Sequence, residues 1–107
     1  MSAVLVLTTV GHDFDARSLA NALVDARVAA CVNMLPGVHS VYRWEGRVAS
    51  DDEQLLVMKT TSDRVDALRE KLFSLHPYEV PEFVVIHAGS IAAAYAAWIE
   101  EGVKTAE

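Results

Sequence analysis

Residues 29–46, AACVNMLPGVHSVYRWEG, decide the fold of this chain. They are rich in β-branched and aromatic side chains and lack the periodicity of a helix, so they predict an extended strand. Pro36-Gly37 interrupts this strand and predicts a bulge or bend, because proline removes a hydrogen bond from the ladder. Glu45-Gly46 predicts a turn, after which residues 47–60 return as a second arm. The stretch therefore predicts a long β-hairpin.

The length of this hairpin predicts an oligomer. Arms of about 14 to 17 residues would span roughly 50 Å, whereas a domain of this size has a radius of gyration near ~13 Å. The distal half must therefore leave the body, and a two-stranded ribbon alone is marginally stable. Either a partner subunit covers the ribbon, or the ribbon folds back on its own helices. In the first case the interface residues are Val38, Val41, Tyr42 and Trp44.

The segment before the hairpin predicts a strand and a helix. Residues 4–10 form a continuous apolar run, typical of a central strand that is covered on both faces or at a subunit contact. Asp13 or Asp15 can cap the helix that follows. One side of this helix carries an apolar stripe, whose residues recur at helical spacing. They are Ala16, Leu19, Ala20, Leu23, Val24 and Arg27.

The segment after the hairpin predicts a helix, a strand and a last helix. Residues 61–63 can cap the first of these helices, and His76-Pro77 ends it, because proline disfavours helical geometry in the preceding residue. Residues 83–87 form the strand, and Ser90 can cap the last helix, which ends near Gly102. The apolar faces are Val65, Leu68, Leu72 and Leu75 on the first helix, and Ile91, Tyr95, Trp98 and Ile99 on the last.

The resulting order, β-α-β-β-α-β-α, predicts the α+β class. Two βαβ-type halves joined through a hairpin are typical of the ferredoxin-like split βαβ sandwich, in which helices cover one face of a mostly antiparallel sheet. With 107 residues, the chain is expected to form one domain, residues 1–107.

Composition argues against several classes of function. The net charge is -6 and the nine Lys and Arg residues are scattered, so no basic stripe predicts a nucleic-acid partner. No apolar run approaches ~20 residues, so no membrane span is expected. Residues 1–7 lack the basic region of a signal peptide, and one cysteine cannot form an internal disulfide. Together these features predict a cytoplasmic protein.

One dense polar group follows the helix that ends at His76-Pro77. It comprises His76, Tyr78, Glu79 and Glu82, and it can face a cleft together with Lys59 from the hairpin. One hypothesis is a ligand or cation pocket made of imidazole and carboxylates. The other is a rigid turn in which His76 and Glu79 satisfy backbone groups. The sequence does not decide between them.

No catalytic group can be assigned from the sequence. The four histidines lack zinc-motif spacing, and the chain contains neither a Gly-x-Ser-x-Gly elbow nor a glycine-rich phosphate loop. Cys31 lies beside small residues in a strand, which favours an inert buried thiol over a ligand or nucleophile. We therefore expect a protein that is not an enzyme and has no obligatory cofactor.

Three segments together resemble the CutA family, the divalent-cation tolerance proteins. They are residues 29–46, Lys59-Thr60-Thr61, and residues 76–82 with the sequence HPYEVPE, and they follow one another in the order of that family. Arg17-Ser18-Leu19-Ala20 and the last helix, with Tyr95 and Trp98, fit as well. The resemblance covers essentially the whole chain.

The resemblance implies a homotrimer of ferredoxin-like protomers joined through sheet edges, similar to the PII signalling proteins. It also implies tolerance of copper and other divalent cations. Copper binding in the family uses a cysteine at the end of the first strand and two histidines before Pro-Tyr. Here Thr8 or Thr9 stands at the first position, and Leu75 precedes the single matching histidine, His76.

Two functions follow as expectations from the resemblance. The first is a trimer for metal-ion tolerance that binds copper or other divalent cations weakly near His76, Glu79 and Glu82, with Cys31 as the one thiolate. The alternative is a PII-like signalling trimer. It would bind a small anionic ligand between subunits near Lys59, Trp44 and Tyr78.

Overall fold

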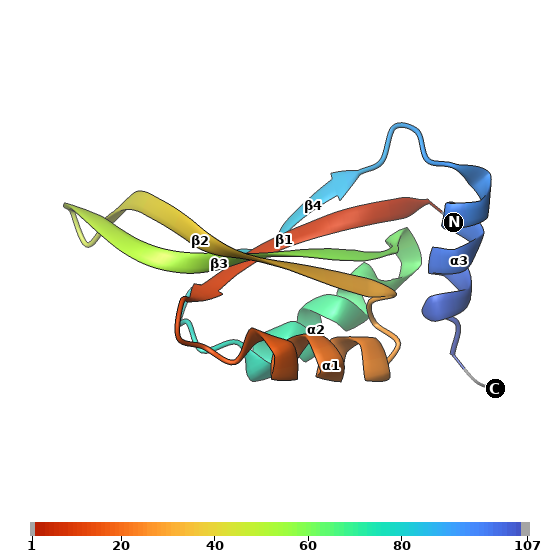
Figure 1. The fold of residues 1–107 in the computed structure, drawn as a ribbon, viewed down its shortest axis with the longest axis horizontal. Helices are drawn as coiled ribbons and strands as arrows, with labels where there is room; N and C mark the ends of the chain where they lie inside the picture. The colour runs from red at the N-terminus through yellow and green to blue at the C-terminus, as the bar shows by residue number, and fades with distance from the viewer. Residues whose placement is uncertain (1, 106–107) are drawn as a thin grey trace.

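Four antiparallel strands form the sheet on which the molecule is built (Figure 1). The computed structural model describes residues 2–105 and orders the strands as β2 (Cys31–Trp44), β3 (Arg47–Thr61), β1 (Ala3–Gly11) and β4 (Val84–His87). The helices are α1 (Ala16–Asp25), α2 (Val65–Leu75) and α3 (Ala93–Gly102), with a 3₁₀ turn, η1 (Ser62–Arg64), before α2. The predicted α+β class and order of elements are confirmed.

Helices α1 and α2 cover one face of the sheet (Figure 1). Every second residue of β1, including Val4, Val6 and Val10, is buried against apolar residues of these helices. Burial of these side chains is the main stabilising term of the domain. The central position of β1 is confirmed, but within the protomer only one of its faces is fully covered. Leu5 and Leu7, on the other face, are half-buried.

The hairpin is present over its predicted length. The β2–β3 register shifts between Leu35 and Val38, and Gly37 has φ +75°, so the expected bulge at Pro36-Gly37 is confirmed. Glu45 and Gly46 make the turn with positive φ values of 50° and 78°. The distal half of the ribbon extends beyond α1 and α2 (Figure 1), in a molecule measuring 46 × 27 × 22 Å.

Helix starts agree with the prediction only at α1. The Asp15 side chain accepts a hydrogen bond from the Ser18 N–H at 3.0 Å, as expected of an N-cap. The predicted cap at residues 61–63 is wrong: η1 forms there instead, and neither it nor α2 has a side-chain cap. Ser90 is no cap either, because α3 begins at Ala93 after Ala92.

The predicted apolar faces of the last two helices are only partly buried. Leu68 and Leu72 are fully buried on α2, but Leu75 is 39 % exposed. On α3 only Ile99 is buried, while the rings of Tyr95 and Trp98 stack at 5.5 Å on the surface. This is because α3 packs at one end of the sheet, where Ile99 and Val103 contact Ala30, and leaves most of its apolar side chains outside.

Candidate functional site

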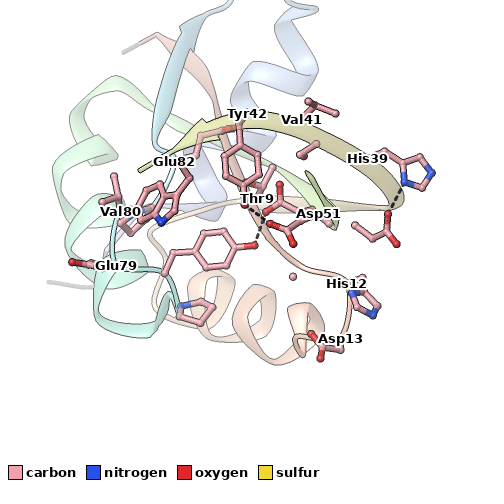
Figure 2. Close-up of a pocket in the computed structure, with 18 residues that line it drawn as sticks. Thr9, His12, Asp13, His39, Val41, Tyr42, Asp51, Glu79, Val80 and Glu82 are labelled. Carbon is pink, nitrogen blue, oxygen red and sulfur yellow. Dashed lines mark hydrogen bonds and ion pairs between the residues drawn. The ribbon is translucent and has the colours of Figure 1, made fainter. Parts of the chain in front are cut away.

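A cleft of about 1070 Å³ lies between the hairpin and the segment that follows α2 (Figure 2). Residues 39–42, 44 and 51–53 of the hairpin form one side, and residues 77–82 form another. The end of β1 and residues 11–13 contribute the rest of the lining. Tyr42, Trp44 and Tyr78 provide aromatic walls. The site is therefore assembled from three parts of the chain that are distant in sequence.

The lining is acidic. None of the described residues that line the cleft is Lys or Arg. Because neither Lys nor Arg is among them, the carboxyl groups create a negative potential in a concave, partly apolar space, and this potential attracts cations. The carboxyl groups belong to Asp13, Asp51, Asp52, Glu53, Glu79 and Glu82.

Two tyrosines hold two of these carboxylates in place. The Tyr78 hydroxyl donates to Glu53 Oε2 at 2.5 Å, and the Tyr42 hydroxyl donates to Asp51. Burial, and then the bond to Glu53, raise the pKa of Tyr78. The bond to Asp51 raises the pKa of Tyr42. Both phenols therefore stay protonated donors, and Glu53, only 6 % exposed, has a fixed position.

Glu82 is a half-buried carboxyl group of the cleft. Burial, and behind it the Glu53 carboxylate, raise the pKa of Glu82 above its ordinary value of 4.5. The native state therefore binds this proton more tightly than the unfolded chain does. At pH 7 the ionised Glu82 opposes folding, and a cation beside it would relieve that cost.

We expect Glu82→Gln to raise the melting temperature at pH 7, by no more than about 5 °C. The gain should disappear as the pH falls below 4.5, where native and unfolded chains both carry the proton. Calorimetric melting at pH 7 and pH 4 measures both effects, with Glu79→Gln as the exposed control. A Glu82 variant that melts like wild type at pH 7 would contradict the expectation.

His76 lies behind the cleft with both ring nitrogens engaged. Nδ1 accepts a hydrogen bond from the Tyr78 N–H at 3.1 Å, so the neutral ring carries its proton on Nε2. Nε2 lies 3.0 Å from the Thr9 carbonyl oxygen and 3.1 Å from Thr8 Oγ1. Burial lowers the pKa of His76. This geometry supports the rigid-turn hypothesis for His76, whose ring tethers β1 to the segment after α2.

The structure brings together some predicted site residues and separates others. Glu79, Glu82, Trp44 and Tyr78 line the cleft, as do Val41 and Tyr42 from the predicted interface set. Val38 is half-buried and pairs with Glu53.

Cys31 and Lys59 are not part of the cleft. They face each other across β2 and β3 near the opposite end of the hairpin, roughly 20 Å along β3 from Glu53. Lys59 Nζ donates to the Tyr95 hydroxyl at 3.1 Å, and Cys31 Sγ lies 3.8 Å from Asn33 Oδ1. Lys59 therefore does not share this cleft of the protomer with Tyr78, and a site between subunits that includes Lys59 stays a prediction.

The sequence did not reveal that carboxylates of β3 belong to the cleft. The polarity of residues 48–53 predicts an exposed segment, yet Asp51, Asp52 and Glu53 line the cleft and Glu53 is buried. His39 also lines it and forms a 2.7 Å ion-pair contact with Asp52. The usable signal is the run of three consecutive acidic residues inside a strand, since such residues are rare there without a partner.

The donor chemistry of the cleft does not fit copper(I). Soft thiolate and thioether ligands select that ion, and Cys31 lies elsewhere. Carboxylate oxygens suit hard cations such as Mg²⁺, Mn²⁺ and Ca²⁺. Within residues 2–105, however, no group of three His, Cys, Asp or Glu side chains is arranged to hold a metal ion. The cleft therefore offers a diffuse acidic surface, with no preformed coordination cage among these residues.

Residues 4–102 match the family described as "CutA1 divalent ion tolerance protein". The chain belongs to this family. The divalent-cation tolerance protein CutA of Thermus thermophilus is 45 % identical over 91 % of this chain and 94 % of its own length. Human protein CutA is 38 % identical over 94 % of this chain, which spans only 56 % of that relative. The resemblance seen in the sequence is thus confirmed.

Solved CutA structures share the fold. The T. thermophilus protein superposes with a TM-score of 0.91 at 43 % identity, covering 95 % of this chain and 99 % of that one. A protein described as "PII-like protein CutA" from Nostoc gives 0.87 at 35 % identity, covering 94 % and 97 %. These CutA relatives are named for tolerance or likeness to PII, and none of those names is that of an enzyme.

The relatives come from more than one compartment. An Arabidopsis relative is named chloroplastic; it is 36 % identical, and this chain spans 56 % of its length. An Archaeoglobus structure is described as periplasmic. Among the described residues of this chain, no helix is long and apolar enough to cross a membrane.

Proposed function

We propose that this CutA protein is a trimeric, cytoplasmic divalent-cation tolerance protein that binds hydrated divalent cations weakly in the acidic cleft. The observation that carries the proposal is the six-carboxylate lining without Lys or Arg among the described lining residues. Hard cations keep several waters and need few direct ligands. A diffuse acidic site is therefore compatible with weak binding, although the described residues form no cage.

The ligand set in this proposal differs from the sequence expectation. Glu79 and Glu82 remain, and Asp51 and Glu53 join them, because all four line one cleft. His76 and Cys31 are left out, since the His76 nitrogens already have protein partners and Cys31 lies outside the cleft. Preferential copper binding consequently loses its support.

The trimer is supported by an apolar face that the protomer leaves open. This face is opposite α1 and α2, and its residues lie next to one another in the strand register. Leu35, Val84 and Ile86 are more than 40 % exposed there. A contiguous apolar face of this kind is typical of a subunit interface. The residues of this open sheet face are Leu5, Leu7, Leu35, Leu55, Val57, Val84 and Ile86.

A PII-like signalling trimer is the second candidate, supported by the solved relative described as PII-like. The cleft argues against the anionic ligand expected for it, because the described lining carries six carboxylates and Lys59 lies outside. An effector that enters this cleft should be cationic. Native mass spectrometry of protein from its own cells tests this, and a retained anionic ligand would contradict it.

Isothermal titration calorimetry with Mn²⁺ tests the cation proposal. Wild type should bind with a Kd in the range of about 10⁻⁴–10⁻³ M, as weak carboxylate sites do. An Asp51→Asn, Glu79→Gln, Glu82→Gln triple variant should lose at least most of that binding. The matched control neutralises three acids outside the cleft: Asp63→Asn, Asp66→Asn and Glu70→Gln.

Two results would count against the cation proposal: wild type without Mn²⁺ binding at millimolar concentration, or equal loss in the control. Binding of Cu²⁺ or Zn²⁺ far tighter than that of Mn²⁺, abolished by His76→Ala, would restore the site expected from the sequence. Fractionation of the source cells tests the cytoplasmic location separately.

A further inference from the structure

The acidic cleft is much larger than a hydrated metal ion. About six water molecules around a divalent cation occupy roughly 200 Å³, or about a fifth of the 1070 Å³ of the cleft. The cleft is close in size to the upper end of the range of about 300–1,000 Å³ that is typical of pockets for small organic molecules. It therefore has room for a cation with an organic body.

The apolar part of the lining also favours an organic cation. Tyr42, Trp44 and Tyr78 contribute aromatic rings, and Val41 and Val80 contribute aliphatic side chains. An ammonium group is attracted to the face of an aromatic ring, and an alkyl chain gains free energy by leaving water beside apolar walls. A metal ion that keeps its water shell uses neither contact. The lining therefore suits a cation that carries an alkyl chain.

Two carboxylates of β3 stand at a defined spacing. Asp51 and Glu53 are two residues apart on one strand, so they share a face and their Cα atoms are roughly 6.6 Å apart. Tyr42 and Asp51 point into the space between the hairpin and the segment after α2 (Figure 2). The Tyr42 hydroxyl engages Asp51 Oδ2 and the Tyr78 hydroxyl engages Glu53 Oε2. Since an ionised carboxylate has about four acceptor sites on its two oxygen atoms, both groups can accept further hydrogen bonds.

This spacing matches a diamine with a four-carbon chain. Its two nitrogen atoms lie about as far apart as the two Cα atoms, because five single bonds of about 1.5 Å join them in a zigzag. One ammonium group can therefore reach Asp51 while the other reaches Glu53.

The charge of Glu53 also lacks a cationic partner. This side chain is only 6 % exposed, and no Lys, Arg or His within residues 2–105 forms an ion pair with it. Its carboxylate also raises the pKa of Glu82, so the two groups lie close enough to repel each other. A ligand with two or more ammonium groups would relieve more of this repulsion than a ligand with one.

We infer that the cleft binds an aliphatic diamine or polyamine. Its ammonium groups bind the carboxylates of Asp51 and Glu53, and its alkyl chain lies against the aromatic walls. This inference rests on the proposed function in one respect, since both require a cleft that attracts cations. It goes further because it gives the aromatic rings a role and names the chemical class of the ligand.

Isothermal titration calorimetry with 1,4-diaminobutane tests this inference, with 1-aminobutane and Mn²⁺ as comparison ligands. Wild type should bind the diamine about tenfold more tightly than 1-aminobutane, because two linked ammonium groups bind two carboxylates at once. Trp44→Leu should weaken diamine binding about threefold and leave Mn²⁺ binding unchanged, since only the alkylammonium contacts the ring. Trp98→Leu is the matched control and should bind all three ligands like wild type. Trp98 is also exposed, but it stacks on Tyr95 of α3 outside the cleft.

The outcomes separate this inference from the proposed function. Mn²⁺ binding without diamine binding would overturn the inference and leave the proposed function in place. Diamine binding no tighter than that of 1-aminobutane would overturn it too, and this comparison needs no variant. So would a folded Trp44→Leu variant that binds the diamine like wild type, with circular dichroism as the test of folding. Diamine binding without Mn²⁺ binding would support the inference and remove the metal ion from the proposed function, whereas binding of neither would overturn both.

Discussion

A Leu7→Glu variant is expected to be a folded monomer at micromolar concentration, where we propose that wild type is a trimer. Leu7 lies on the open sheet face, between Val57 of β3 and Val84 of β4, and its side chain points away from the helix-covered core. In the protomer a glutamate there can reach water. In the proposed assembly it would be buried in an apolar contact, where an unpaired carboxylate costs several kcal/mol per subunit.

Sedimentation velocity and circular dichroism decide this prediction together. Val24→Glu is the matched control, since Val24 is 40 % exposed on α1 and lies outside the open sheet face. The control should assemble like wild type. A Leu7→Glu trimer with an unchanged dissociation constant would show that subunits do not meet through this face.

A His76→Ala variant is expected to lose about 3 kcal/mol of the free energy of unfolding at pH 8. The substitution removes the partner of the Tyr78 N–H, the Thr9 carbonyl oxygen and Thr8 Oγ1. Thr8 is fully buried, so water cannot replace the ring there without rearrangement. The segment after α2 would also lose its link to β1.

The effect of His76→Ala should depend on pH with a definite sign. Burial lowers the pKa of His76 in the native state, so the unfolded chain gains the proton first as the pH falls through 6.5. Wild type therefore loses stability below that pH, whereas the variant has no such loss at this position. The difference between the two should be largest above pH 6.5 and should shrink in acid.

Urea unfolding at pH 8 and pH 5.5 measures both parts. The protomer concentration is kept fixed, because the proposed assembly would contribute to stability. His87→Ala provides a control at an exposed histidine on β4. Equal stability of His76→Ala and wild type at pH 8 would refute the tethering role. A difference that stays constant between the two pH values would refute the role of burial in its titration.

Local signals were enough to predict most of the fold. The β-branched run around Pro36-Gly37 and the Glu45-Gly46 turn predicted the hairpin, because both features act on neighbouring backbone. Caps at residues 61–63 and Ser90 failed for the opposite reason. Tertiary contacts, such as the two hydrogen bonds from Arg64 to the Arg27 carbonyl oxygen, position the start of α2 without a local cap.

The cleft could be predicted only in part. His76, Tyr78, Glu79 and Glu82 are close in sequence, so the sequence alone is enough to reveal that they cluster. Glu53 joins them only because the segment after α2 crosses the end of β1 and β3, and this brings the Tyr78 hydroxyl to its carboxylate. No local sequence pattern predicts that the segment after α2 crosses the end of β1 and β3.

The bulge at Pro36-Gly37 also changes which face of the sheet each later residue of β2 occupies. Before it, Leu35 pairs with Leu55; after it, Val38 pairs with Glu53, so β2 has advanced three residues and β3 two. Residues directly opposite each other share a face, so this one extra residue puts Tyr42 and Trp44 on the side of Asp51 and Glu53. Without the bulge, the same residues paired in regular register would present alternate side chains, Val41 and Arg43, on the side of the carboxylates instead. The bulge at Pro36-Gly37 therefore decides which side chains of β2 line the cleft, although it lies several residues before Tyr42.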